Sequence, residues 1–307
     1  MTNRREFLKR TSALAGWSAV AAGCRLPRAA AAPYPAYENT LRDRLWMWGH
    51  DSGVYDGPKN MYNIPPSAPL SMADGIRSMG IPNVCVIRRG IPDAAYVQQF
   101  REVKRVAWSL AMGSEESYRE LKDYVFGLRD TLPNLTGYYL DDFFHIGGES
   151  DPCRKSAIEP APAALTIYEL MDLYGETVAY KRRLDLAVVL YVSQLCPAIQ
   201  PAMKYVDTIS LWIWDGSDIQ KIEEAFRKYR TLVPDKPTLL GIYMWDFGGQ
   251  KELGTAFMAR QLDYAFRLYK EGQIEGMIFH CTPLCNKGLA AVEYARVWIA
   301  EHGNEGR

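Results

Sequence analysis

The feature that most constrains the fold of this chain is an eightfold repetition of one pattern, a short apolar run followed by a polar break and an amphipathic stretch. Short, nearly continuous apolar runs are typical of strands buried on both faces, as the strands of parallel sheets are. We predict eight strands, at Leu45–Trp48, Asn83–Ile87, Arg105–Leu110, Thr136–Leu140, Leu186–Val192, Thr208–Trp214, Thr238–Trp245 and Gly276–Phe279.

Helical stretches lie between these runs and after the last one. Ser114 and Ser217, each followed by an acidic residue, are cap residues that mark where helices begin. The predicted helices are Ser71–Met79, Asp93–Val103, Glu115–Thr131, Ala164–Arg183, Ile199–Tyr205, Asp218–Leu232, Glu252–Glu271 and Leu289–Glu301. This alternation predicts an α/β fold, a (β/α)8 TIM barrel. A doubly wound open sheet would have a glycine-rich first turn, and no G-x-G-x-x-G motif follows any predicted strand.

The first residues carry a different pattern, which we interpret as a targeting signal rather than as part of the fold. Arg4 and Arg5 precede Phe7-Leu8-Lys9, and a weakly apolar run, too short to span a bilayer, extends from Thr11 to Gly23. This pattern closely resembles a bacterial twin-arginine export signal. The resemblance implies that the export machinery is a partner and that the protein is periplasmic or on the cell surface.

Two ends of this signal fit the sequence. Ala21-Ala22-Gly23-Cys24 resembles a lipoprotein cleavage box, which would leave Cys24 as a lipidated N-terminus and the only membrane contact. Alternatively, Ala29–Ala32 supplies small residues for ordinary cleavage. The lipid anchor is slightly preferred. We therefore expect a signal over residues 1–32, a linker over 33–43 and one barrel domain over 44–307.

Bulk composition narrows the class of ligand. The chain has 307 residues with 36 basic and 36 acidic side chains, so its formal net charge is zero and nothing indicates nucleic-acid binding. Aromatic residues make up 12%, including 8 Trp and 19 Tyr, a content that suits stacking on flat ligand faces such as those of sugars. Cys85 and Cys196 are interpreted as buried small side chains, and the spacing Cys281-x3-Cys285 lacks the partner residues of a metal site.

Chemistry-bearing residues gather where the predicted strands end, which is where (β/α)8 barrels place their sites. Alternation along the strands turns further aromatic residues inward. Together they predict an aromatic-walled cup that binds a carbohydrate through Trp48, His50, Asp51, Arg88, Tyr139, Tyr191, Trp214, Tyr243, Trp245 and His280. Arg88 would also allow an anionic sugar. Long connections over 51–68 and 147–163 are expected to form binding walls.

The run from Leu135 to His145 is the centre of this prediction, because it breaks off in two adjacent carboxylates. Alternation puts Asp141 at the mouth of the cup. Asp142 would then lean away from it, toward the helix layer or the loop, where it could orient its neighbour. Asp141 is accordingly the first candidate for catalysis and Asp142 a weaker one.

The segment Gly137-Tyr-Tyr-Leu-Asp141-Asp142-Phe-Phe resembles the fourth-strand motif of (β/α)8 glycoside hydrolases. The resemblance implies an enzyme that hydrolyses a glycosidic bond, with Asp141 as nucleophile or electrostatic stabiliser. A second carboxyl must protonate the leaving oxygen. Asp215 and Asp246 are the candidates, and each follows a Trp that could desolvate it. Asp215 is ranked ahead, because Asp on strands four and six occurs in several α-glycosidase families.

Two other functions remain open on the sequence alone. His50, Asp51, Asp141, Asp246 and His280 could bind a metal in a sugar isomerase or a metal-dependent hydrolase, although no H-x-H or H-E-x-x-H spacing supports this. The leading interpretation needs no cofactor. The aromatic cup could also belong to a barrel that binds glycans without catalysis.

Overall fold

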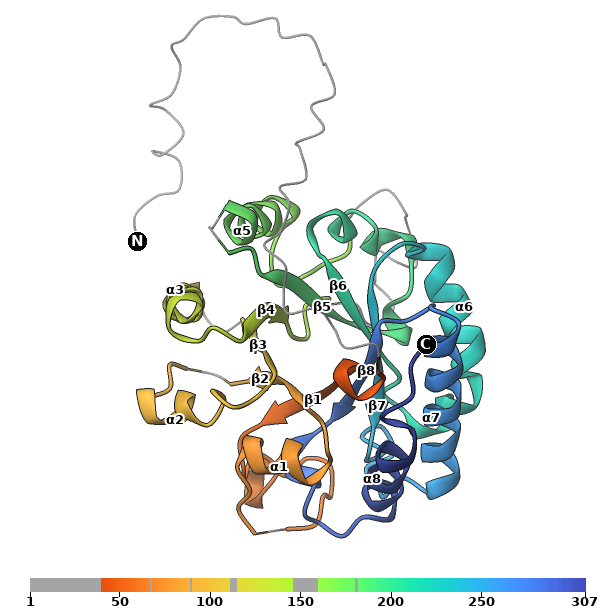
Figure 1. Cartoon of the computed structure of the whole chain (residues 1–307). Helices are drawn as coiled ribbons and strands as arrows, with labels where there is room; N and C mark the ends of the chain where they lie inside the picture. The colour runs from red at the N-terminus through yellow and green to blue at the C-terminus, as the bar shows by residue number, and fades with distance from the viewer. Residues whose placement is uncertain (1–39, 67, 89, 111–114, 146–159, 180–181) are drawn as a thin grey trace, which may run out of the picture. The chain divides into compact units, whose positions relative to one another are not determined.

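The structure is a computed structural model that describes residues 40–66, 68–88, 90–110, 115–145, 160–179 and 182–307. Eight parallel strands close into one barrel in sequence order, and β8 pairs with β1 (Figure 1). They are β1 (Leu45–His50), β2 (Asn83–Ile87), β3 (Arg105–Ser109), β4 (Leu135–Leu140), β5 (Asp185–Tyr191), β6 (Thr208–Trp212), β7 (Thr238–Tyr243) and β8 (Gly276–His280). The predicted (β/α)8 barrel is confirmed.

Helices cover the outside of the barrel (Figure 1). They are α1 (Met72–Ser78), α2 (Ala94–Gln98), α3 (Glu115–Thr131), α5 (Ile167–Ala179), α6 (Ile222–Leu232), α7 (Thr255–Lys270) and α8 (Ala290–His302). The helix predicted over Ile199–Tyr205 is instead a pair of 3-10 helices, Pro197–Ile199 and Ala202–Tyr205, separated at Pro201, which has no N–H to continue a helix. Among the helices of the described ranges, none is long and apolar enough to cross a membrane.

Large aromatic side chains fill the interior of the barrel near the carboxyl ends of its strands. The ring of Trp48 lies 5.4 Å from that of Tyr139 and 5.5 Å from that of Trp212, both edge to face. Gly241 makes this packing fit, because a Cβ there would lie 2.1 Å from Cε3 of Trp212. Tyr139, predicted to bind the ligand, is only 3% exposed and does not line the cavity described below. Tyr139 therefore belongs to the packed interior, which reaches higher in the barrel than strand alternation alone suggests.

The opposite end of the barrel is closed by a buried ionic cluster. The carboxylate of Asp43 accepts hydrogen bonds from Nη1 and Nη2 of Arg105 at 3.0 and 3.2 Å and pairs with Nζ of Lys104 at 2.6 Å. Just before it, Leu41 is fully buried and donates its N–H to the carbonyl of Glu305 at 2.8 Å. Residues 41–43, expected to end the linker, therefore belong to the barrel, far from the strand ends that carry the site.

Candidate active site

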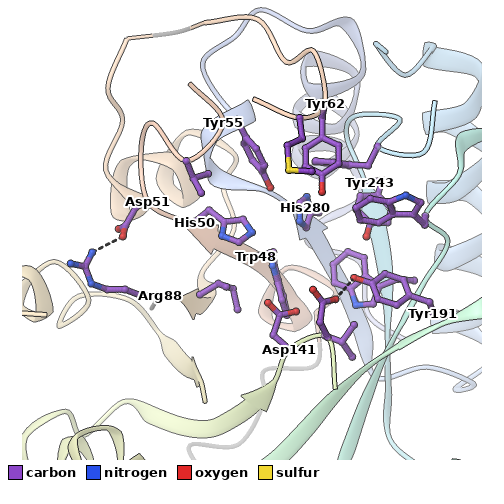
Figure 2. Close-up of a pocket in the computed structure, with 18 of the residues that line it drawn as sticks. Trp48, His50, Asp51, Tyr55, Tyr62, Arg88, Asp141, Tyr191, Tyr243 and His280 are labelled. Carbon is purple, nitrogen blue, oxygen red and sulfur yellow. Dashed lines mark hydrogen bonds and ion pairs between the residues drawn. The ribbon is translucent and has the colours of Figure 1, made fainter. Parts of the chain in front are cut away.

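A cavity of about 640 Å3 opens at the carboxyl ends of the strands. Figure 2 shows the side chains that point into it, with the Arg88–Asp51 pair at one end, Tyr62 and Tyr191 at the other, and Asp141 and His280 between them. Ten residues predicted for the site line this cavity: Trp48, His50, Asp51, Arg88, Asp141, Asp142, Tyr191, Trp214, Tyr243 and His280. The barrel thus brings together side chains from seven of its eight strands and the loops that follow them.

Asp141 and Asp142 follow β4 in a turn, and both line the cavity. The expectation that Asp142 leans away from the cup is wrong. The strand ends at Leu140, and the backbone of Asp142 has a φ of 45°, a left-handed conformation that Asp tolerates better than most residues, so alternation no longer fixes the side chain. The Asp142 side chain is exposed, and its Oδ1 accepts a hydrogen bond from the hydroxyl of Tyr191 at 2.9 Å.

Two tyrosines that remain protonated, and can therefore donate hydrogen bonds, flank these carboxylates. Burial raises the pKa of Tyr191 and of Tyr243 well above 10, and the charges of Asp141 and Asp142 add to this effect, so both phenols keep their protons. Gln261, buried on α7, fixes the backbone of Tyr243. Its Oε1 accepts the N–H of Tyr243 and its Nε2 donates to the Tyr243 carbonyl, each at 3.1 Å.

His50 and His280 form the wall that β1 and β8 contribute, with ring centroids 5.6 Å apart. Burial lowers the pKa of His50 to about 4, against a smaller opposing effect of Asp51. Burial, and then repulsion from His50, lowers the pKa of His280 well below 6.5. Both rings are therefore neutral at neutral pH. His280 packs 4.7 Å from Phe247 and 5.0 Å from Tyr243, which encloses its Nδ1. These histidines can exchange hydrogen bonds with a ligand but bring no positive charge.

Arg88 and Asp51 form a polar end of the cavity. Nη1 of Arg88 lies 2.5 Å from Oδ2 of Asp51, the hydroxyl of Tyr96 donates to Oδ1 of Asp51 at 2.6 Å, and the guanidinium lies 4.3 Å from the centre of the Tyr96 ring. The charge of Arg88 is thus compensated inside the protein. An anionic sugar group would have to compete with Asp51, whereas the hydroxyls of a neutral sugar can bind beside the pair.

The other end of the cavity is aromatic. Trp214 lies 5.8 Å from Tyr62, and Tyr62 lies 5.0 Å from Phe247, measured between ring centroids. Tyr55, Met61, Tyr62 and Phe247 line the cavity but were not predicted. The expected binding wall over 51–68 contains the first three of them, so its two tyrosines were the available signal. The second expected wall, 147–163, lies mostly outside the described residues.

Trp245 was predicted to contact the ligand, but it does not line the cavity and is only 4% exposed. Its indole Nε1 donates a hydrogen bond to the carbonyl of Tyr62 at 3.0 Å. The strand β7 ends at Tyr243, so the side chain of Trp245 is directed by the loop rather than by strand alternation. Its role is to hold the Tyr62 loop.

The two carboxylates predicted to donate the proton also lie outside the cavity lining. Asp215 caps the 3-10 helix Gly216–Lys221, and its Oδ1 accepts from the N–H of Ser217 at 2.8 Å and from the Ser217 hydroxyl at 2.6 Å, which lowers its pKa. Asp246 is 5% exposed, and its Oδ1 accepts the N–H groups of Gly216 at 2.9 Å and Gly249 at 2.8 Å. Both carboxylates therefore organise loops in this structure.

The five residues proposed as metal ligands do not assemble into a metal site. Asp246 is directed at backbone amides, and within the described part of the chain no three His, Cys, Asp or Glu side chains are arranged to hold a metal ion. Cys85, Cys281 and Cys285 are buried and free, as was predicted for Cys85. Cys196 is also buried, as predicted, but it is disulfide-bonded.

No protein-family model matches this sequence, and no curated protein does. Solved structures with the same fold include the catalytic domain of a hyperthermophilic chitinase from Pyrococcus furiosus, with 12% identity and a TM-score of 0.55 over 88% of this chain and 99% of the chitinase chain. An endo-α-mannosidase from Bacteroides thetaiotaomicron has 12% identity and a TM-score of 0.50 over 86% and 98%. A xylanase and α-amylase inhibitor protein has 11% identity and a TM-score of 0.51 over 85% and 98%. At these identities the similarity is one of fold.

Proposed function

We propose that the protein is a glycoside hydrolase whose two working carboxyl groups are Asp141 and Asp142. One observation carries the proposal: both carboxyls line a single aromatic cavity at the carboxyl ends of the strands, beside two protonated tyrosines. Hydrolysis of a glycosidic bond needs one carboxyl that protonates the leaving oxygen and a second that attacks or stabilises the anomeric carbon. No other carboxylate of the described residues, apart from Asp51 in its ion pair, lines the cavity.

The two carboxyls differ in their surroundings, and we assign their roles from this difference. The hydroxyl of Tyr191 donates a hydrogen bond to Oδ1 of Asp142, and we assign the other oxygen, Oδ2, to protonate the leaving oxygen. Asp141 is less exposed and takes the nucleophilic or electrostatic role that its motif implies.

This assignment replaces Asp215 and Asp246 as the proton donor. Both of these side chains already accept two hydrogen bonds from neighbouring N–H or O–H groups and lie outside the cavity lining. A carboxyl that must meet a glycosidic oxygen needs direct contact with the substrate. Asp142 has that access.

The chemistry of the cavity favours a neutral saccharide as the substrate. Its histidines are neutral, its arginine is paired with Asp51, and its walls are aromatic. The similar folds of a chitinase and an endo-α-mannosidase support a carbohydrate substrate, while the inhibitor protein with the same fold means that the fold alone does not establish catalysis.

We further propose that the protein works after export by the twin-arginine route, anchored by a lipid at Cys24. The signal lies outside the described residues, so the proposal rests on the sequence of residues 1–32. The disulfide at Cys196 is in keeping with an oxidising compartment. Replacing Arg4 and Arg5 by Lys and fractionating the cells tests the route: the protein should remain in the cytoplasm, and unchanged export would refute it.

The experiment that tests the proposed reaction is a screen for reducing-sugar release from neutral, uronic and sulfated glycans. It compares the wild-type protein with Asp141→Asn, Asp142→Asn and a matched surface control, Asp263→Asn, which removes an exposed carboxylate on α7. Every variant is assayed with and without a chelator. We expect release by the wild type and the control, insensitive to the chelator, and a loss of at least about 100-fold in each cavity variant.

Three results would contradict the proposal. Full activity in either cavity variant would remove that carboxyl from the reaction. Loss of activity with chelator would favour the metal-dependent enzyme. Glycan binding by the wild type without release of product from any substrate would favour the binding barrel.

A further inference from the structure

We infer that Met61, Tyr62 and Trp214, here called the rim, form a subsite for a second sugar ring, which would stack there next to the ring held at Asp141. The inference deepens the proposed function, because it assumes that the ligand is a saccharide, but it does not require that the saccharide is cleaved. It predicts that the natural ligand contains at least two linked sugars.

The first argument is the unusual exposure of the rim. Met61 is 70% exposed and Trp214 is 37% exposed, although both line the cavity. Trp214 is not loose, because its ring packs 5.5 Å from Phe247 and 6.0 Å from Tyr191. A large, supported aromatic face that stays open in a cavity is suited to stack against the C–H face of a sugar.

The second argument is that the loop carrying Met61 and Tyr62 is held in one conformation. Its turn is built by Asn60, whose Nδ2 donates to the carbonyl of Ile64 at 2.8 Å and whose Oδ1 accepts the N–H of Ile64 at 3.0 Å. Ile64 is 1% exposed and anchors the loop in the core. From the other side, Trp245 donates to the carbonyl of Tyr62. A preformed contact surface loses little entropy when it binds a ligand.

The third argument is the position of the rim relative to the carboxyls. Figure 2 places Tyr62 at the end of the cavity away from Arg88, with Asp141 between the two ends. The negative charge of Asp142 reaches Tyr62 and, after burial, contributes to raising the pKa of its phenol. A sugar on the rim would therefore lie beside Asp142. The bond that joins it to a sugar over Asp141 would pass the pair of carboxyls.

Isothermal titration calorimetry tests the subsite in the Asp141→Asn background, so that binding is measured without turnover. The probes are the monosaccharide, disaccharide and tetrasaccharide of whichever series the hydrolysis screen identifies. If none is hydrolysed, the chito-, cello-, malto- and manno- series are used. The variants are Trp214→Ala, Trp214→Phe and Trp245→Phe. The matched control is Tyr168→Ala, which removes an aromatic side chain that is 76% exposed on α5 and does not line the cavity.

We expect affinity in the background protein and in the control to rise at least about tenfold from the monosaccharide to the disaccharide. This corresponds to about 1.4 kcal/mol. Trp214→Ala should lose that gain while binding the monosaccharide normally, and Trp214→Phe should keep most of it. Trp245→Phe should lose part of it, since the ring remains but the hydrogen bond to the rim does not. Unchanged melting curves would show that all variants fold.

The inference is overturned if Trp214→Ala keeps the full gain from chain length, or if no oligosaccharide binds the background protein. Failure of the proposed function has a different signature. A wild-type protein that releases no sugar, yet binds disaccharides through Trp214, would retain the subsite and lose the hydrolase.

Discussion

Replacement of Asp246 by Asn tests whether this carboxylate stabilises a loop or takes part in catalysis. Its Oδ1 accepts two backbone N–H groups, and Gly216 and Gly249 approach so closely that a Cβ on either would lie 2.7 or 2.4 Å from the carboxyl group. Asn fits the same space and can present an oxygen to both amides. The Asn side chain carries no charge, however. A hydrogen bond to a charged group contributes roughly 1.5–3 kcal/mol to stability, against about 1 kcal/mol for one between neutral groups.

For two hydrogen bonds, one of them to a partly exposed amide, the expected loss is about 2 kcal/mol of unfolding free energy. That loss should lower the melting temperature by roughly 4–8 °C in a domain of this size class. Asp246→Ala should cost more, about 2–4 kcal/mol, because it leaves the buried N–H of Gly216 without an acceptor. Calorimetric melting of the two variants beside the wild type measures both values.

Activity measured at 25 °C, where Asp246→Asn remains folded, completes the test. We expect kcat within about threefold of the wild type, against a loss of at least about 100-fold for Asp141→Asn. If Asp246→Asn melts like the wild type but loses 100-fold in kcat, Asp246 is a catalytic acid and the reasoning that removes it from the site is wrong.

Three further predictions test other parts of the molecule. Because burial lowers the pKa of His50 from 6.5 to about 4, the unfolded chain binds its proton first, so stability should fall as the pH drops from 6.5 to 4. The loss of unfolding free energy is at most about 3 kcal/mol, and the partial exposure of the ring reduces it. Urea titrations at the two pH values should find a smaller loss in His50→Gln than in the wild type. Asp43→Ala leaves the buried Arg105 without its carboxylate, so it should lower the unfolding free energy by about 3–5 kcal/mol in denaturant titrations while KM is unchanged. A variant as stable as the wild type would contradict a stabilising role of this ion pair. Tyr191→Phe removes the hydrogen bond to Asp142 and should lower kcat about tenfold, whereas a change in KM alone would mean that Tyr191 only binds substrate.

The strands of this barrel were predictable because each is buried on both faces, which makes its sequence continuously apolar. The same regularity placed Trp48, His50, Tyr243 and His280 in the cavity, since alternation holds as long as a residue remains within or directly beside its strand. What could be predicted of the site is therefore the part that the strands themselves carry.

Apart from Tyr139, which lies within β4 but packs inside the barrel, the misplaced site residues lie beyond the last residue of a strand. Asp142 turns into the cavity through a left-handed residue, and Trp245 and Asp246 turn away from it into hydrogen bonds with loop backbone. Which way a loop residue points depends on partners far apart in sequence, such as Tyr62 for Trp245, and no local pattern encodes such a pair. Met61 and Tyr62 of the rim were missed for the same reason, since they lie in a connection without periodicity, whereas Trp214, close to the end of β6, was predicted.

The similar folds of two hydrolases and an inhibitor protein mean that the polar chemistry of the cavity, and not the barrel, must decide between catalysis and binding. The left-handed backbone of Asp142 adds strain of a kind that clusters at functional sites. Binding alone could use the aromatic walls, the histidines and the Arg88–Asp51 pair. The proposed hydrolysis needs in addition one carboxyl that protonates the leaving oxygen and another that acts at the anomeric carbon, and Asp141 and Asp142 are the carboxyls outside the Arg88–Asp51 pair that line the cavity among the described residues.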